Sequence, residues 1–180
     1  MKNLKMLVAG FCLSTGLMAF FSFTPVYQPA KNSQMIADWE RAKAYTKEYL
    51  DASTEASIAF KPKAEMRSFA EQMLHLSDAN YNLVSGATGK KSPVGQLEKG
   101  PGNKTKAELT KIVMDSYDFV INAVKEMDEP KLGTMVTIFN TDMTAEVAFN
   151  KAFEHQTHHR GQTAVYLRLS GLTPPQEKLF

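Results

Sequence analysis

Three of the four histidines of the chain lie within five residues, at His155, His158 and His159. The segment has a helical pattern, and residues four positions apart on a helix project from the same face. His155 and His159 can therefore bind one divalent metal ion, for which imidazole is a common ligand. The fourth histidine, His75, could complete a three-ligand site. Three neutral nitrogens with an open position for water or substrate are typical of a catalytic mononuclear centre.

The surroundings of the histidine pair favour a metal site. His155 and His159 continue the inward stripe of Ala148, Ala152 and Thr163, so both side chains should face the interior. Two buried imidazoles are unfavourable when charged, whereas a metal ion uses their lone pairs and keeps them neutral. The alternative is a pair of core histidines that hydrogen-bond to neighbouring helices.

His75 is less clearly placed by its own helix. It lies off the middle of the apolar stripe, beside Ser68, Gln72 and Ala79, so periodicity alone makes it a flank residue. A flank of small and polar residues can form a pocket wall between helices. The residues leave two interpretations open, a third metal ligand and an exposed helix histidine.

The polar residues beside the pair suggest supporting roles. His158 points about a quarter turn away from His159 and is expected at the surface or behind the ligands. Arg160 is expected to form an ion pair with a carboxylate such as Glu154 or Asp142, with an anionic substrate as the alternative.

Two further residues of this helix suggest packing and orientation. Gly161 lies in the helix interior, where glycine is unfavourable, which suggests close packing there. Gln162 could orient a ligand histidine through its second nitrogen, or be an ordinary helix residue. No general base is evident, and the candidates for the rim of the pocket, each expected to be structural, are Asp78, Asn80, Tyr117, Asn140 and Asp142.

Two familiar metal patterns are excluded. A zincin protease has glutamate directly after the first histidine, and this position is Gln156. A ferritin-like diiron bundle needs Glu-x-x-His on two helices. Glu71 and His75 are four positions apart, and the residue three after Glu154 is Thr157.

The first thirty residues differ from the rest of the chain. Lys2 and Lys5 precede an uncharged apolar stretch from 6 to 23, which is typical of an export signal. We therefore expect residues 1–30 to be a signal peptide, or else an uncleaved membrane anchor, and the protein to be exported, periplasmic or extracytoplasmic. Cys12 is the single cysteine and lies in this stretch, so no mature disulfide is expected.

Residues 31–180 are expected to form one domain. Apolar periodicity and cap signals predict four helices, at about 33–61, 63–85, 105–128 and 141–170. Glycines and prolines make 86–103 a loop, and the β-branched run 136–139 is expected to be a connector. The fold class predicted is all-α, a four-helix bundle.

Composition supports a globular domain and gives no support to nucleic-acid binding. The chain is 43% hydrophobic and 22% charged, which is enough apolar mass for a core. The net charge of +2 is spread among mixed lysines and acidic residues, without a basic block that would follow a phosphate backbone.

The segment 155–162, HQTHHRGQ, and the segment 72–80, QMLHLSDAN, resemble the DinB family of DinB/YfiT-like metal-binding bundles. The resemblance covers roughly residues 33–173. It implies a four-helix bundle with a long crossover connection, for which the loop 86–103 is a natural place, and a homodimer as the common assembly. It also implies that His75, His155 and His159 are the metal ligands.

The resemblance also suggests what the site does. Some members are thiol-dependent transferases or isomerases, and others resemble metal-dependent hydrolases. We therefore expect an enzyme that uses a divalent metal ion, zinc first and nickel, manganese or iron as alternatives, to activate water or a thiol for an unidentified small-molecule substrate. Export would separate the protein from cytosolic thiols, which weighs against thiol transfer. The alternative is a non-enzymatic bundle that binds a metal or a small ligand.

Overall fold

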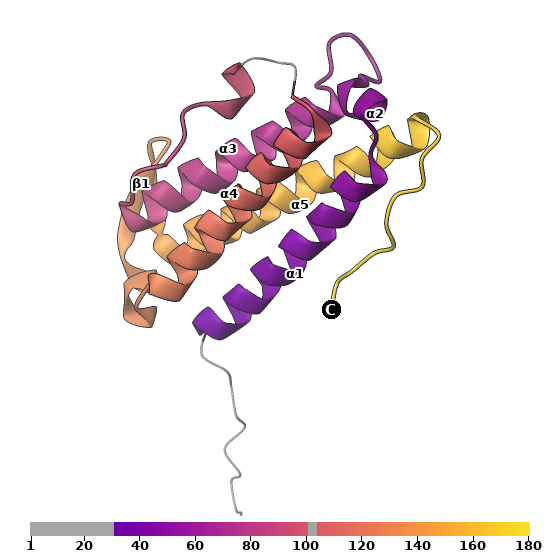
Figure 1. Ribbon diagram of the computed structural model, residues 1–180. Helices are drawn as coiled ribbons and strands as arrows, with labels where there is room; N and C mark the ends of the chain where they lie inside the picture. Colours follow the sequence, from indigo (N-terminus) through magenta and orange to yellow (C-terminus); the bar gives the residue numbers. More distant parts are fainter. Residues whose placement is uncertain (1–30, 101–103) are drawn as a thin grey trace, which may run out of the picture.

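Four long helices lie side by side in the computed structural model, which describes residues 31–100 and 104–180 (Figure 1). They are α1 (Lys31–Ala52), α3 (Phe69–Thr88), α4 (Lys106–Glu126) and α5 (Ala145–Leu169). Helix α3 packs mainly against α5 and α4, and α1 packs against α4 and α5. The prediction of a mainly helical fold is confirmed. The predicted export signal and Cys12 lie outside the described residues.

The helices begin where side chains can satisfy free backbone N–H groups. Thr105 and Glu108 form the predicted capping box at α4, and Ser68 and Glu71 form the same arrangement at α3. Thr144 accepts a hydrogen bond from the backbone N–H of Val147 at the start of α5. Side-chain hydrogen bonds from these polar residues therefore fix where α3, α4 and α5 begin.

Both predicted boundaries of each of the first two helices differ from the structure. The first helix is already formed at Lys31 and ends at Ala52, because Thr54 caps a separate short helix, α2 (Glu55–Ala59). The next helix begins only at Phe69, after the Ser68 cap, rather than directly after residue 62. It continues to Thr88 and ends at Gly89, which has a φ of 72°.

A small hairpin replaces the predicted connector. Strand β1 (Met135–Ile138) pairs antiparallel with β2 (Thr141–Thr144). A short 3-10 helix, η2 (Glu129–Gly133), precedes β1 in the chain. Residues 141–144 were predicted to open the last helix, but they are extended. Their polar residues resemble a helix entry in sequence, and only the pairing with β1 identifies them as a strand.

The connection from α3 to α4 is held against α3. It contains a 3-10 helix, η1 (Leu97–Lys99), and the two carboxylate oxygens of Asp78 accept hydrogen bonds from the backbone N–H groups of Leu97 and Glu98, at 2.8 and 3.0 Å. Because Asp78 is on α3, these bonds place the Glu98 side chain beside the same helix.

The core is apolar and contains several aromatic rings. Trp39 is 2% exposed and meets Tyr117 and Phe153 edge-on, with ring centroids 5.8 and 5.3 Å apart. Among the residues described, no helix combines the length and the apolar character needed to cross a membrane.

Candidate metal centre

The structure brings His75, His155 and His159 together. His75 comes from α3, and the other two histidines come from successive turns of α5. The ring centroids are 5.0 Å apart for His75 and His155, 4.6 Å for His75 and His159, and 4.3 Å for the pair on α5. One nitrogen of each ring lies within 4.8 Å of the other two. One divalent ion can therefore reach all three residues.

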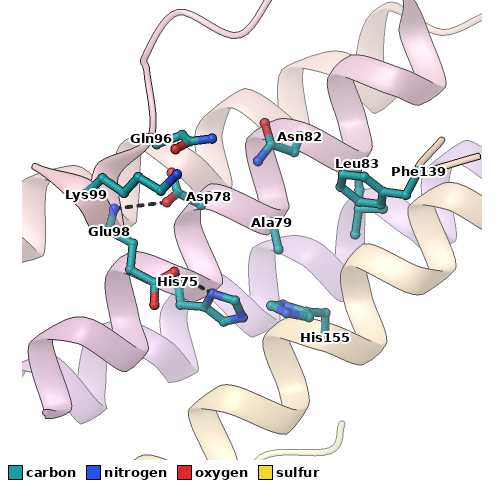
Figure 2. A pocket seen from close by; sticks show the side chains of 10 residues that line it. All are labelled: His75, Asp78, Ala79, Asn82, Leu83, Gln96, Glu98, Lys99, Phe139 and His155. Atoms are coloured by element: carbon teal, nitrogen blue, oxygen red, sulfur yellow. Dashed lines mark hydrogen bonds and ion pairs between the residues drawn. The ribbon is translucent and has the colours of Figure 1, made fainter. Parts of the chain in front are cut away.

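His75 reaches this cluster because of how α3 and α5 pack. These two helices form the most extensive helix contact of the described chain. Figure 2 shows the His75 ring and the His155 ring facing one another from the two helices. Periodicity placed His75 on the flank of its helix. In the structure this flank lies at the boundary between α3 and α5, and the His75 side chain is partly buried rather than exposed.

Hydrogen bonds orient two of the rings. The Nδ1 of His159 lies 2.7 Å from the Gln72 amide oxygen, and the Nδ1 of His75 lies 2.9 Å from a Glu98 carboxylate oxygen. Both oxygens are acceptors, so each Nδ1 is the donor of its hydrogen bond. Metal-binding histidines are commonly held in this way, and the arrangement leaves Nε2 free for an ion.

The Nδ1 of His155 is buried and has no hydrogen-bond partner among the described residues. A buried polar atom without a partner raises the free energy of the folded state. Its position within a cluster of three converging imidazoles fits a bound cation, because coordination would satisfy the lone pairs that no protein donor reaches. The residues present therefore fit a divalent metal ion.

Burial also keeps the pair on α5 neutral. Desolvation, the largest cause, acts together with the positive charges of the neighbouring groups to lower the pKa of His155 to about 4 and that of His159 to about 3. Both imidazoles are therefore unprotonated near pH 7, with lone pairs available to a metal ion.

Glu98 is a residue of the site that the sequence did not reveal. Its carboxylate accepts hydrogen bonds from Arg67 as well as from His75. Burial alone would raise the pKa of Glu98, but the hydrogen bonds from Arg67 and His75 outweigh it and the net shift is downward. The available signal was one acidic residue in a loop rich in glycine and proline, and nothing in the spacing connects that residue with His75.

Gln72 performs the role that was suggested for Gln162. Its amide oxygen holds His159, and its amide nitrogen donates to Gln162 at 2.7 Å. Gln162 in turn contacts His158, with 2.7 Å between the two Nε2 atoms. Gln162 thus supports the ligand histidine through Gln72, and the exposed His158 lies outside the cluster, as predicted.

The predicted ion pair of Arg160 was wrong. Its guanidinium is buried, donates to the Gln156 amide oxygen at 2.9 Å and lies 4.5 Å from the centre of the Tyr45 ring. Glu154 instead pairs with Lys151. Arg160 is a core residue because the position after His159 faces α1 rather than solvent.

The predicted close packing at Gly161 was also wrong. Gly161 is exposed, and a Cβ atom added there would meet nothing within 4 Å. Close packing occurs at Gly86 instead, where an added Cβ would lie 2.7 Å from the Ile138 side chain. The glycine that allows close packing is therefore on α3, where the hairpin contacts it, and not on α5.

Of the suggested rim residues, Asp78 lines the same cavity as His75 and His155. Asn80 and Tyr117 are buried among the helices, where Tyr117 donates to Gln156 at 2.8 Å. Asn140 and Asp142 belong to the hairpin turn and β2, where Asp142 accepts a hydrogen bond from Thr137. The contacts of Asp78, Tyr117 and Asp142 are thus structural ones, and the roles of the candidates remain a prediction.

A cavity of about 300 Å³ opens next to the histidines. His75 and His155 line one part of it, and side chains from α3, the α3–α4 connection and the hairpin form the rest (Figure 2). A small molecule could therefore reach an ion bound by the cluster.

The chain belongs to the DinB superfamily, whose family model matches residues 38–163. It is similar in structure to a DinB-like protein from Bacillus cereus ATCC 10987, with 22% identity and a TM-score of 0.68 over 81% of this chain and 97% of the other. A DinB-like protein from Bacillus subtilis gives 18% identity and a TM-score of 0.63 over 82% and 96% of the two chains. At these identities the likeness shows the fold. No relative of curated function matches the chain.

Proposed function

We propose that His75, His155 and His159 bind one divalent metal ion and that the protein is a metal-dependent enzyme. The observation that carries this proposal is the convergence of three ring nitrogens within 4.8 Å next to a cavity of about 300 Å³. A metal ion bound there would lower the pKa of a water or thiol and make it a nucleophile near neutral pH.

The number of ligands supports chemistry rather than a purely structural site. In the described part of the chain the cluster contains three histidines and no fourth ligand. Structural zinc sites are usually closed by four protein ligands, whereas catalytic sites keep a position open. Gln72 and Glu98 hold two of the rings in place, so that the open position has a fixed direction.

One observation favours the alternative, a non-enzymatic bundle that binds a metal or a small ligand. Glu98 is the carboxylate nearest to His75, and both of its oxygens are engaged, one by Arg67 and one by His75. Asp78 is engaged by two backbone N–H groups. Neither carboxylate is therefore free to act as a general base, which a hydrolase commonly needs.

The metal content of the purified protein tests the proposal. We expect about one divalent ion per chain by elemental analysis, with zinc first and nickel, manganese or iron as alternatives. His75→Ala, His155→Ala and His159→Ala should each lose it, and the matched control His158→Ala, on the same helix but exposed, should retain it. No metal in the wild-type protein after supplementation would contradict the site.

Activity assays separate the enzyme from the binding protein. The metal-loaded protein would be tested with ester and amide substrates for hydrolysis and with low-molecular-weight thiols for transfer. Turnover that disappears in His155→Ala supports the enzyme. Tight metal binding without turnover supports the alternative.

Export and assembly are separate proposals. Residues 1–30 have the composition of an export signal, which supports a periplasmic or otherwise extracytoplasmic location. Cell fractionation with N-terminal sequencing of the mature protein tests this. The family resemblance supports a homodimer, which sedimentation of the purified protein tests.

A further inference from the structure

Phe139 lies in a turn whose backbone does not suit it. Its φ is 51°, and the following residue, Asn140, has a φ of 60°. A two-residue hairpin turn of type I′ requires this left-handed conformation at both positions, and asparagine and glycine adopt it readily. A bulky aromatic residue is rare there because its Cβ clashes with the backbone. Strain of this kind tends to occur at functional sites, where the side chain has a role besides folding.

The Phe139 side chain contributes little to the core. It is 76% exposed, whereas the preceding residue, Ile138, is 6% exposed. Neither the turn nor the core therefore explains why phenylalanine occupies this position. Its side chain lines the cavity beside the histidines, together with Ala79, Leu83 and His155.

The hairpin is held firmly at this cavity. Ile138 packs so closely on α3 that a Cβ atom added to Gly86 would lie 2.7 Å from its Cδ1 atom. The glycine thus lets β1 approach α3 directly, one residue before Phe139. Figure 2 shows Phe139 and Leu83 at one end of the cavity and His75 and His155 at another part of it.

Asn82 is an exposed polar residue that lines the cavity near this end, and the other polar groups of the lining lie away from it (Figure 2). The carboxylates of Asp78 and Glu98 are occupied by hydrogen bonds within the protein. Gln96 and Lys99 belong to the exposed α3–α4 connection, and neither makes a side-chain hydrogen bond within the described residues. The cavity therefore combines an apolar end at Phe139 with a polar rim and an imidazole cluster.

We propose that Phe139 determines specificity by forming, with Leu83 and Ala79, an apolar wall for the substrate. The substrate class is a small molecule with an aromatic or branched alkyl group at this wall and a polar group against His75 and His155. A volume of about 300 Å³ accommodates one ring and a short polar group. The orientation of the polar group rests on the proposed metal site, whereas the apolar contact does not need a metal ion.

Hydroxamates test this inference, because they bind metal ions and can carry either a methyl or a phenyl group. We would titrate zinc-loaded protein with acetohydroxamate and benzohydroxamate and follow the backbone amide signals near Phe139 by NMR. We expect benzohydroxamate to bind at least about tenfold more tightly, because its ring buries apolar surface. Phe139→Ala should weaken benzohydroxamate binding by about threefold to tenfold, as expected for a lost aromatic contact. Acetohydroxamate binding should not change.

Met135→Ala is the matched control, since Met135 is an exposed apolar residue of the same hairpin that does not line the cavity. It should bind both hydroxamates like the wild-type protein. Equal affinity for the two hydroxamates, or a benzohydroxamate affinity that Phe139→Ala leaves unchanged, would overturn the inference while leaving the metal site intact.

A second arm separates this inference from the metal site. If the protein binds no zinc, the proposed function fails, and benzamide titrated into the metal-free protein still tests the wall. Shifts near Phe139 that weaken in Phe139→Ala would support it, and their absence would overturn it.

Phe139→Gly should raise the unfolding midpoint by removing the strain, yet weaken benzamide binding. These opposite effects are expected if Phe139 is kept for binding rather than for folding.

Discussion

The orientation of His159 depends directly on Gln72. This side chain is 5% exposed, accepts from the ligand ring and donates to both Gln162 and Tyr166. Because two further groups fix the amide, its oxygen has one direction available, toward Nδ1 of His159. The imidazole is thereby held with Nε2 toward the cluster.

Gln72→Leu should lower the metal affinity by about 10-fold to 100-fold, because His159 loses the acceptor that sets its tautomer and direction. Leucine has a similar volume, so the helix contacts should persist. Isothermal titration with zinc measures the effect, and circular dichroism checks the fold. Glu98→Gln, which keeps an oxygen acceptor for His75, should have the smaller effect. Wild-type affinity in Gln72→Leu would show that this hydrogen bond does not support the site.

The metal-free protein should lose stability as the pH falls below about 6.5. Burial lowers the folded-state pKa of His155 to about 4 and of His159 to about 3, so the unfolded chain binds protons first. The free energy of unfolding therefore decreases from the unfolded-state pKa down to the folded-state values. Urea unfolding at a series of pH values measures this slope. His155→Gln with His159→Gln should flatten it, and an unchanged slope would contradict the assignment.

The hairpin and the α3–α4 connection supply residues of the site in addition to those on helices α3 and α5. Helices α3 and α5 supply the histidines, but Glu98 comes from the connection and Phe139 from the hairpin. Each of these segments is attached to α3 by a specific contact, through Asp78 in one case and through Gly86 in the other. The site thus depends on how irregular segments are fixed to a regular frame.

Gly86→Ala should destabilise the protein by about 1–3 kcal/mol, because the added methyl group overlaps the buried Ile138 side chain. Gly161→Ala is the matched control, since an added Cβ there meets nothing within 4 Å in an exposed part of a helix. This control should stabilise the protein by up to about 1 kcal/mol through helix propensity. Thermal unfolding of the metal-free variants measures both. Equal effects of the two substitutions would contradict the close contact between hairpin and helix.

The sequence predicts what depends on local periodicity and misses what depends on distant contacts. The spacing of His155 and His159 identifies their shared face, and Thr105 with Glu108 identifies a helix start. Periodicity did not decide whether His75 is a metal ligand, because its position depends on the packing of α3 on α5. Only the family resemblance indicated that it is one. Glu98 was missed because a hydrogen bond across the fold defines its place in the site. The hairpin was missed because residues 141–144 resemble a helix entry in sequence, and only their pairing with β1 identifies them as a strand.

For the whole molecule, the fold is a helical frame that places three imidazoles beside a small cavity. The helices share one apolar core, and the histidines lie at its edge, between α3 and α5. This arrangement buries the rings enough to keep two of them neutral while leaving access from the cavity. Membership of the DinB superfamily agrees with this frame.

X-ray absorption by the zinc-loaded protein counts the atoms bound to the metal and so tests whether three histidines hold it. We expect three imidazole nitrogens at about 2.0–2.1 Å from the metal and one further light atom from water. His75→Ala should remove one imidazole or abolish binding, and His158→Ala should keep all three imidazoles. Fewer than three imidazoles in the wild-type protein, or the loss of one imidazole in His158→Ala, would contradict a site formed by His75, His155 and His159.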